Sequence, residues 1–205
     1  MDIYDFPYII VESPKKSTVE TIEAFYIINK KVNTLQHVNA VAEMNMKIAE
    51  QYGLNKEKCC LAALLHDIST VMKPNDMTVY AINNGISLDN SEKKYPFLLH
   101  QQISMLFARE IFGVRDIDIL SAIECHTTLK SNPNKYDMSL FIADKLSWDQ
   151  SSRPPFFDMV NTALSISLEN ACLQYINYII DNNMILYPHT WFIDAKKYLD
   201  KSIRK

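Results

Sequence analysis

Histidine and aspartate recur at the ends of apolar segments in this chain of 205 residues. The clearest case is the pair His66 and Asp67, which follows the apolar run 61–65. A carboxylate buried beside an imidazole costs free energy unless something pairs with both, and a divalent metal ion does so. Four other segments carry the same residue types: His37, His100, His126 and Asp144. One such residue alone is typical of a core histidine or a cap, but five segments in one chain favour a metal site.

Imidazole and carboxylate ligands without thiolate suit iron, manganese, cobalt, nickel or zinc. One ion could be held by four residues: His37, His66, Asp67 and Asp144. A second could be held by His100 and His126, with the Asp67 carboxylate bridging the two ions. Two ions about 3.5–4 Å apart can activate a hydroxide and stabilise charge on a phosphoryl oxygen. The expected chemistry is hydrolysis of a phosphate ester or anhydride through a metal-bound hydroxide, although periodicity alone does not prove the grouping.

The elements that must position these side chains are helices. The chain has only three glycines, and its long amphipathic stretches favour an all-α fold over a turn-rich sheet. Residues 9–11 could form a short strand or an extended arm, 32–36 a turn before His37, and 88–95 a polar connection. Ser17, Asn55 and Asp116 are expected caps. Helices are predicted at 18–30, 37–52, 56–69, 76–84, 97–112, 117–125, 138–148, 156–180 and 190–199.

The length of the chain suits one domain. Residues 1–33 are expected to form an N-terminal arm and helix, and residues 34–150 the core that holds the metal site. Residues 151–205 are expected to add C-terminal helices packed on the same domain. These last helices would widen the core or provide the surface of a homodimer.

Composition limits the classes of function. Hydrophobic residues make up 48% of the chain and charged residues 22%, and the net charge is -3. This balance gives no basic footprint for nucleic acid, and no apolar run approaches the length of a membrane span. The four cysteines form no Cys-x-x-Cys pair. They are expected to be reduced, mostly buried thiols in a cytoplasmic protein.

The order of these residues resembles a known family. The chain resembles the HD-domain phosphohydrolases, named for a His-Asp pair, and within them the YqeK-like symmetrical bis(5'-nucleosyl)-tetraphosphatases. The resemblance covers about residues 34–149, and the ordered set of motifs is far more specific than the pair alone. The motifs are His37-Val38-x-x-Val41, Leu61-Ala62-Ala63-Leu64-Leu65-His66-Asp67-Ile68, Leu98-Leu99-His100, Ala122-Ile123-x-x-His126-Thr127-Thr128 and Ile142-Ala143-Asp144-Lys145.

The resemblance implies a compact helical bundle with a metal site between helices. It implies a dinuclear centre, often containing iron, that cleaves dinucleoside polyphosphates into nucleoside diphosphates. The six histidines and aspartates named above map onto the metal ligands. Asp67 and Lys145 are then the expected catalytic residues, and a nucleotide is the expected substrate.

Three departures from the family pattern concern the substrate rather than the metal. Thr70 stands where the family usually has lysine, Leu129 where it has glycine, and residues 146–149 where it continues with Glu-Pro and an arginine. Lost cations would weaken phosphate neutralisation. Leu129 could narrow the mouth of the pocket. The expected phosphate-contacting residues are Thr127, Lys73, Lys145 and Arg153, while Trp148 or Tyr136 could stack on a base.

Two alternatives remain open at this point. The altered phosphate contacts could leave a nucleotide sensor or an inactive relative that keeps the metal site. The chain could also be a helical interaction protein without metal.

Overall fold

The computed structural model describes residues 2–147 and 153–203, and within these ranges all regular structure is helical. The predicted all-α fold is confirmed. The elements in chain order are η1 (Ile3–Asp5), α1 (Thr18–Ile28), α2 (Val32–Tyr52), α3 (Lys56–Leu65), η2 (Ile68–Val71), α4 (Pro74–Asn83), α5 (Asn90–Lys94), η3 (Pro96–Leu99), α6 (His100–Glu110), α7 (Ile117–Cys125), α8 (Lys135–Leu146), α9 (Phe157–Leu164), α10 (Leu168–Asp181) and α11 (Thr190–Ile203).

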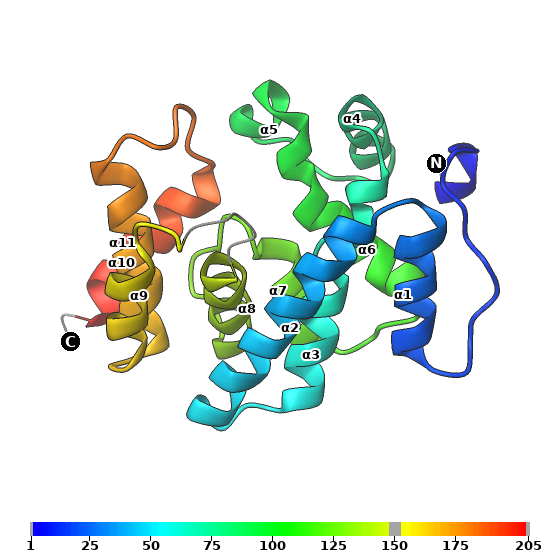
Figure 1. The fold of residues 1–205 in the computed structure, drawn as a ribbon. Helices are drawn as coiled ribbons and strands as arrows, with labels where there is room; N and C mark the ends of the chain where they lie inside the picture. The colour runs from blue at the N-terminus through cyan, green and yellow to red at the C-terminus, as the bar shows by residue number, and fades with distance from the viewer. Residues whose placement is uncertain (1, 148–152, 204–205) are drawn as a thin grey trace.

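Helix α3 lies at the centre of the bundle, in contact with α2, α7 and α8 (Figure 1). It is short and apolar, and Ala63 and Leu65 are fully buried. The Asn55 side chain caps its first turn by accepting a hydrogen bond from the Lys58 backbone N–H at 3.0 Å. Because α3 is surrounded by helices, whatever follows its last residue is delivered to the middle of the fold.

The α-helix ends one residue before the His-Asp pair. His66 keeps right-handed helical angles (φ -60°, ψ -33°), but Asp67 does not (φ -107°, ψ 14°). The chain then tightens into the 3₁₀ helix η2. The prediction of one helix over 56–69 is therefore wrong at this point, because Asp67 leaves the α-helical conformation.

Several other predicted boundaries are also corrected. Helix α2 begins at Val32, so His37 lies in its second turn and no turn occupies 32–36. The polar connection 88–95 contains the short helix α5. Residues 9–11 form no strand. The long helix predicted over 156–180 is two helices, because Ser167 starts α10 by accepting a hydrogen bond from the Asn170 backbone N–H at 3.1 Å.

Both ends of the chain pack against neighbouring helices. Helix α10 contacts α8, α9 and α11, and the rings of Phe141 and Tyr175 meet edge to face with centroids 5.4 Å apart. At the other end, Phe6 is buried with its ring centroid 6.1 Å from that of Tyr80. Figure 1 shows the C-terminal helices on one side of the bundle and the N-terminal segment on the other.

Two further sequence expectations concern the thiols and the membrane. All four cysteines are free, and Cys59, Cys125 and Cys172 are buried. Burial raises the pKa of Cys59 to about 11, so this thiol stays protonated. Within the described ranges, no helix has the length and apolar character needed to cross a bilayer.

The Ser167 cap gives a test of the corrected C-terminal topology. Replacing Ser167 by alanine should lower the free energy of unfolding by about 1 kcal/mol, because the first turn of α10 loses a side-chain acceptor. Denaturant unfolding followed by circular dichroism measures this change, with exposed Ser13→Ala as the control. A continuous helix over 156–180 would instead gain stability from the alanine.

Candidate metal centre

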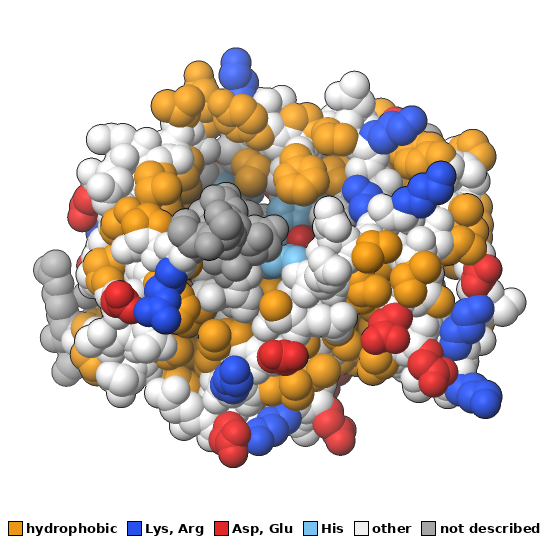
Figure 2. Space-filling model, viewed as in Figure 1, with side chains coloured by type: hydrophobic (Ala, Val, Ile, Leu, Met, Phe, Trp, Pro, Cys, Tyr) orange, Lys and Arg blue, Asp and Glu red, His pale blue; other side chains and the backbone are white. Residues whose placement is uncertain are grey.

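The ligand-type side chains come from five places in the fold and meet in one hollow. Figure 2 shows histidine and acidic side chains at the bottom of a depression with hydrophobic side chains near its rim. Helix α2 supplies His37, and the turn after α3 supplies His66 and Asp67. The remaining three stand at the start of α6, after the last residue of α7 and in α8: His100, His126 and Asp144.

One group of ligand atoms lies around His66. The ligand atoms of His37, His66 and Asp67 all lie within 4.8 Å of one another. Asp144 closes this group, because its Oδ1 is 3.1 Å from His37 Nε2 and 3.7 Å from His66 Nε2. The sequence-based grouping of these four residues therefore corresponds to a real cluster.

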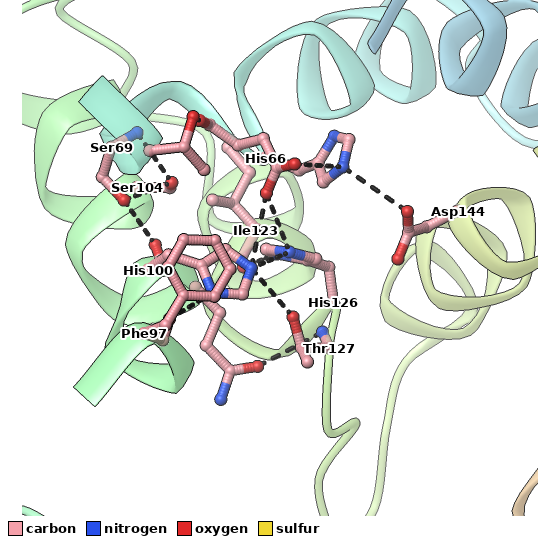
Figure 3. A network of polar contacts seen from close by, with 12 residues as sticks. His66, Ser69, Phe97, His100, Ser104, Ile123, His126, Thr127 and Asp144 are labelled. Carbon is pink, nitrogen blue, oxygen red and sulfur yellow. Dashed lines mark hydrogen bonds and ion pairs between the residues drawn. The ribbon is translucent and has the colours of Figure 1, made fainter. Parts of the chain in front are cut away.

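A second group shares Asp67 with the first. The ligand atoms of Asp67, His100 and His126 also lie within 4.8 Å of one another. Asp67 Oδ1 is 3.3 Å from His100 Nε2 and 3.6 Å from His126 Nε2, while its Oδ2 is 3.7 Å from His66 Nε2 (Figure 3). The two oxygens of one carboxylate thus face the two groups, as a bridging ligand would.

Three of the histidines are oriented in the same way. In each, Nδ1 lies 2.7–2.8 Å from the carbonyl oxygen three residues earlier. A carbonyl accepts but cannot donate, so Nδ1 carries the proton and Nε2 is turned into the site. Such outer hydrogen bonds fix the ring and leave Nε2 as the ligand atom. The histidines and their carbonyl partners are His66 with Ala63, His100 with Phe97, and His126 with Ile123.

The surroundings of His66 Nε2 and of the His100–His126 pair favour a bound cation. His66 Nε2 is buried and has no hydrogen-bond partner among the described residues. His100 Nε2 and His126 Nε2 are 3.0 Å apart, although both rings already carry their proton on Nδ1. Two lone pairs facing each other repel, unless a cation lies between them. Two nitrogens bound to one ion at about 2.1 Å and a right angle would be about 3.0 Å apart. The donor set therefore fits a divalent transition metal.

The carboxylates control the protonation of His66. Burial alone would lower the pKa of His66, but the negative charges of Asp67 and Asp144 outweigh burial and raise the pKa to about 9. Burial by itself would raise the pKa of Asp67, but the neighbouring imidazoles hold it well below its usual range. Without metal, His66 therefore carries protons on both ring nitrogens at pH 7, and the carboxyl groups of Asp67 and Asp144 are ionised.

The second group behaves differently. Burial lowers the pKa of His126 to about 4, and it also lowers the pKa of His100. Both rings are neutral at pH 7, the state that binds metal. An incoming ion would therefore displace a proton from His66 in the first group, whereas the two histidines of the second group are already neutral.

Buried polar residues next to the ligands support the second group. The Ser69 hydroxyl donates to the His100 carbonyl at 2.9 Å, and the Ser104 hydroxyl donates to Ser69 Oγ at 3.0 Å. Gln101 Oε1 accepts from the backbone N–H groups of Thr127 and Thr128 at 3.2 and 3.3 Å. None of these three supporting residues, Ser69, Ser104 and Gln101, was predicted from the sequence. They could have been recognised as polar residues on an otherwise apolar helical face, close to a predicted ligand.

Two residues expected to contact phosphate lie at the site. Thr127 Oγ1 is 3.1 Å from His100 Nε2. Lys145 Nζ is mostly buried, 2.5 Å from Asp144 Oδ2 and 3.3 Å from the His126 carbonyl oxygen. Burial alone would lower the pKa of Lys145, but the Asp144 carboxylate outweighs burial and raises it. Lys145 therefore stays charged and holds Asp144 in place.

The other two cations have partners elsewhere. Lys73 Nζ lies over the Tyr8 ring, 4.4 Å from its centroid. Arg153 is exposed, 3.2 Å from Asp158 Oδ1 and over the ring of Phe157. Their assignment to phosphate binding stays a prediction.

The aromatic candidates for base stacking have different outcomes. The hydroxyl of Tyr136 accepts from the Asn55 backbone N–H at 3.2 Å, at the start of α3. That end of the helix is about 16 Å from His66. The structure therefore does not bring Tyr136 to the site, and Trp148 lies outside the described residues.

Two of the three departures from the family pattern have structural explanations, while part of the third, 146–149, lies outside the described residues. The Thr70 hydroxyl donates to the Asp67 carbonyl at 2.7 Å, so it supports the turn that carries the pair. Leu129 has φ 57°, a left-handed conformation that favours glycine and costs about 1–2 kcal/mol in other residues. Its side chain is fully buried in the core. The expectation that Leu129 narrows the pocket mouth is wrong, and the glycine of the family pattern suits the backbone conformation.

Comparison with known proteins agrees with this geometry. Residues 34–149 match the HD domain family. The chain belongs to the HD-domain family. The matched range contains every candidate metal ligand from His37 to Asp144, so the resemblance inferred from the order of the motifs is confirmed. Membership in this family implies a divalent metal ion, and the two groups around Asp67 are where this HD domain could hold it.

Individual relatives lead to the same superfamily. The chain is 41% identical over 150 residues to an "Uncharacterized protein in pepC 5'region" of Lactococcus lactis subsp. cremoris, covering 73% of this chain and 76% of that one. It is 28% identical over 159 residues to a symmetrical bis(5'-nucleosyl)-tetraphosphatase of Halalkalibacterium halodurans, covering 76% and 83%. The crystal structure of a predicted HD superfamily hydrolase involved in NAD metabolism from Clostridium acetobutylicum superposes with a TM-score of 0.80 at 25% identity, covering 91% and 97%. The compact helical bundle is thereby confirmed, and the chain is an HD-superfamily phosphohydrolase.

Metal affinity should depend on pH through His66. Protons compete with metal for an unperturbed histidine only below about pH 6. At His66 this competition extends to higher pH, because its pKa is raised to about 9. Below that value an ion must displace one proton, so the apparent affinity for Mn²⁺ should rise about tenfold per pH unit from pH 7 to 9 and then level off. Titration against a competing chelator measures this slope. An affinity that does not change over that range would show that His66 is not a ligand.

The bridging carboxylate can be tested by substitution. Asp67→Ala should lower the affinity for metal at least about 100-fold, because both groups lose an oxygen ligand and His66 loses a neighbouring negative charge. Metal analysis after purification without chelator gives the readout. Asp194→Ala, at a partly exposed carboxylate in α11 paired with Lys197, is the matched control. Normal metal content in Asp67→Ala would mean that the ions bind elsewhere.

Proposed function

We propose that this protein hydrolyses a nucleotide, and that its substrate is a dinucleoside polyphosphate cleaved into nucleoside diphosphates. The observation that carries the proposal is the position of Asp67, whose two oxygens face two separate groups of imidazole nitrogens. Two metal ions sharing a carboxylate are suited to phosphoryl transfer to water. Iron is the metal we propose, with manganese, cobalt, nickel or zinc as possible replacements.

The residues of the chain have distinct proposed roles. Bound divalent ions supply an activated water and a Lewis acid for phosphoryl oxygens. Asp67 keeps the two ion sites at a fixed separation. Lys145 holds Asp144 against His37 and adds a positive charge at the edge of the site. The Thr127 hydroxyl, beside His100, is placed to donate a hydrogen bond to a phosphate oxygen.

The choice of substrate rests on relatives. Symmetrical bis(5'-nucleosyl)-tetraphosphatases are related to this chain over three quarters of its length, and their name specifies a nucleotide substrate. Use of the same substrate here is part of the proposal. The homodimer suggested by the C-terminal helices stays a prediction.

A nucleotide sensor is the second candidate. It is favoured by Thr70, which offers no cation where the family pattern usually has lysine, and by Lys145, whose ammonium group is already bound to Asp144. Such a protein would bind nucleotide at the metal centre and release nothing.

Hydrolysis can be measured on protein loaded with Fe²⁺ or Mn²⁺ and then desalted. With diadenosine tetraphosphate we expect ADP as the only nucleotide product, detected by anion-exchange chromatography. Asp67→Ala should lose at least 99% of the rate, and Asp194→Ala should keep it. Calorimetry on the same samples separates the two candidates, because binding without turnover would identify a sensor. Metal-loaded protein that neither binds nor cleaves any nucleotide would contradict both.

A further inference from the structure

A cavity of about 300 Å³ lies next to the metal centre. Its floor is formed by Thr127 and Thr128, which follow His126. One wall is the loop 184–187 between α10 and α11, together with Phe192. Tyr95 and Leu98, just before α6, also line the cavity. The lining is therefore mainly apolar and aromatic, in contrast to the charged centre beside it.

The cavity and the metal centre share an edge. Thr127 lines the cavity, and its hydroxyl oxygen is 3.1 Å from His100 Nε2. The ring of Phe97, next to Leu98 in η3, stacks on His100 with centroids 4.8 Å apart. A ligand held by one end at the metal centre can therefore place its other end in the cavity without crossing bulk solvent.

Polar contacts join the loop wall to the neighbouring helices. Glu92 is fully buried, and its Oε1 lies 3.3 Å from Nε2 of His189, which also lines the cavity. Gln102 of α6 donates to the same Glu92 oxygen at 2.8 Å. The Thr190 hydroxyl donates to Asp89 Oδ2 at 2.6 Å. The loop is thus joined to α5 and to the helix that begins with His100, and the cavity is preformed.

Two aromatic rings stand at the mouth of the cavity. Tyr95 and Tyr187 are 44% and 49% exposed, and their ring centroids are 6.0 Å apart at an interplanar angle of 55°. Lys94 Nζ lies 5.7 Å from the centroid of the Tyr187 ring. Half-exposed aromatic rings beside a polar centre are typical of surfaces that stack on flat ligands, and a base stacked on such a ring gains about 1–3 kcal/mol.

We propose that this cavity binds the nucleobase of a nucleotide whose phosphates lie at the metal centre, with Tyr187 and Tyr95 stacking on the base. The inference rests on the proposed nucleotide hydrolysis and specifies which end of the substrate the protein recognises. A cavity lined mainly by rings and aliphatic side chains selects for a flat aromatic group without strong discrimination between bases. The Glu92–His189 pair acts as a positioning contact, because it holds the loop that carries Tyr187.

The test compares a ligand with a base and a ligand without one. Protein loaded with Mn²⁺ and desalted is titrated by calorimetry with ADP and with pyrophosphate. Tyr187→Leu should weaken ADP binding about tenfold and leave pyrophosphate binding unchanged, because only ADP has a ring to stack. Tyr187→Phe should bind ADP like the wild type. The control is Tyr4→Leu, which removes a 70% exposed ring that lies on the N-terminal segment.

Several outcomes would overturn the inference. ADP binding of wild-type strength in Tyr187→Leu would show that the ring does not contact the base. An equal loss for ADP and pyrophosphate would show that the substitution acts on the metal centre. Hydrolysis measured on the same samples separates this inference from the proposed function. If Tyr187→Leu cleaves diadenosine tetraphosphate and binds ADP as tightly as the wild type, only the proposed base site is wrong. If the wild-type protein binds neither ADP nor pyrophosphate and cleaves nothing, both the base site and the proposed function are wrong.

Discussion

The structure depends on keeping two ionised carboxylates and four imidazoles together inside a helical bundle. Asp67 and Asp144 are mostly buried, and a buried negative charge is stable only beside positive charge or strong donors. Without metal, the proton on His66 and the ammonium of Lys145 supply that charge. An incoming metal ion would displace the second proton of His66, and the ammonium group of Lys145 lies at the edge of the site where a phosphate is proposed to bind. The same electrostatic requirement therefore governs both the stability of the apoprotein and its metal chemistry.

Short hydrogen bonds to the backbone orient three of the ligands. His66, His100 and His126 each donate Nδ1–H to the carbonyl three residues earlier. These carbonyls lie in the last turn of α3, in η3 and in the last turn of α7. The backbone N–H groups of His100 and His126 point to the same two carbonyls, those of Phe97 and Ile123. The local turn therefore fixes the ring together with the backbone and leaves Nε2 to face the site.

The sequence predicted the helical class and the residues that the structure brings together around Asp67, because these depend on residue types and local periodicity. Their role as metal ligands stays a prediction. It did not predict the break after Leu65 or the start of α2 at Val32, because no side-chain cap marks either position. The division of 156–180 was also missed, although Ser167 caps α10 in the ordinary way. The cavity beside Thr127 was also beyond reach. It is formed by Tyr95 and the loop 184–187, which lie about 90 residues apart in the chain, and only tertiary contacts bring them together.

The loss of the lysine at position 70 has to be weighed against the charge of the metal ions. The two proposed ions carry four positive charges against the two carboxylates, and Lys145 adds one more. Such a centre attracts a polyphosphate strongly even with Thr70, because bound cations are the largest local charges in a site. Thr70 instead bonds to the Asp67 carbonyl and stabilises the turn. In the proposed function, the metal ions would supply the attraction for phosphate, and the aromatic cavity beside them would select ligands that carry a flat base.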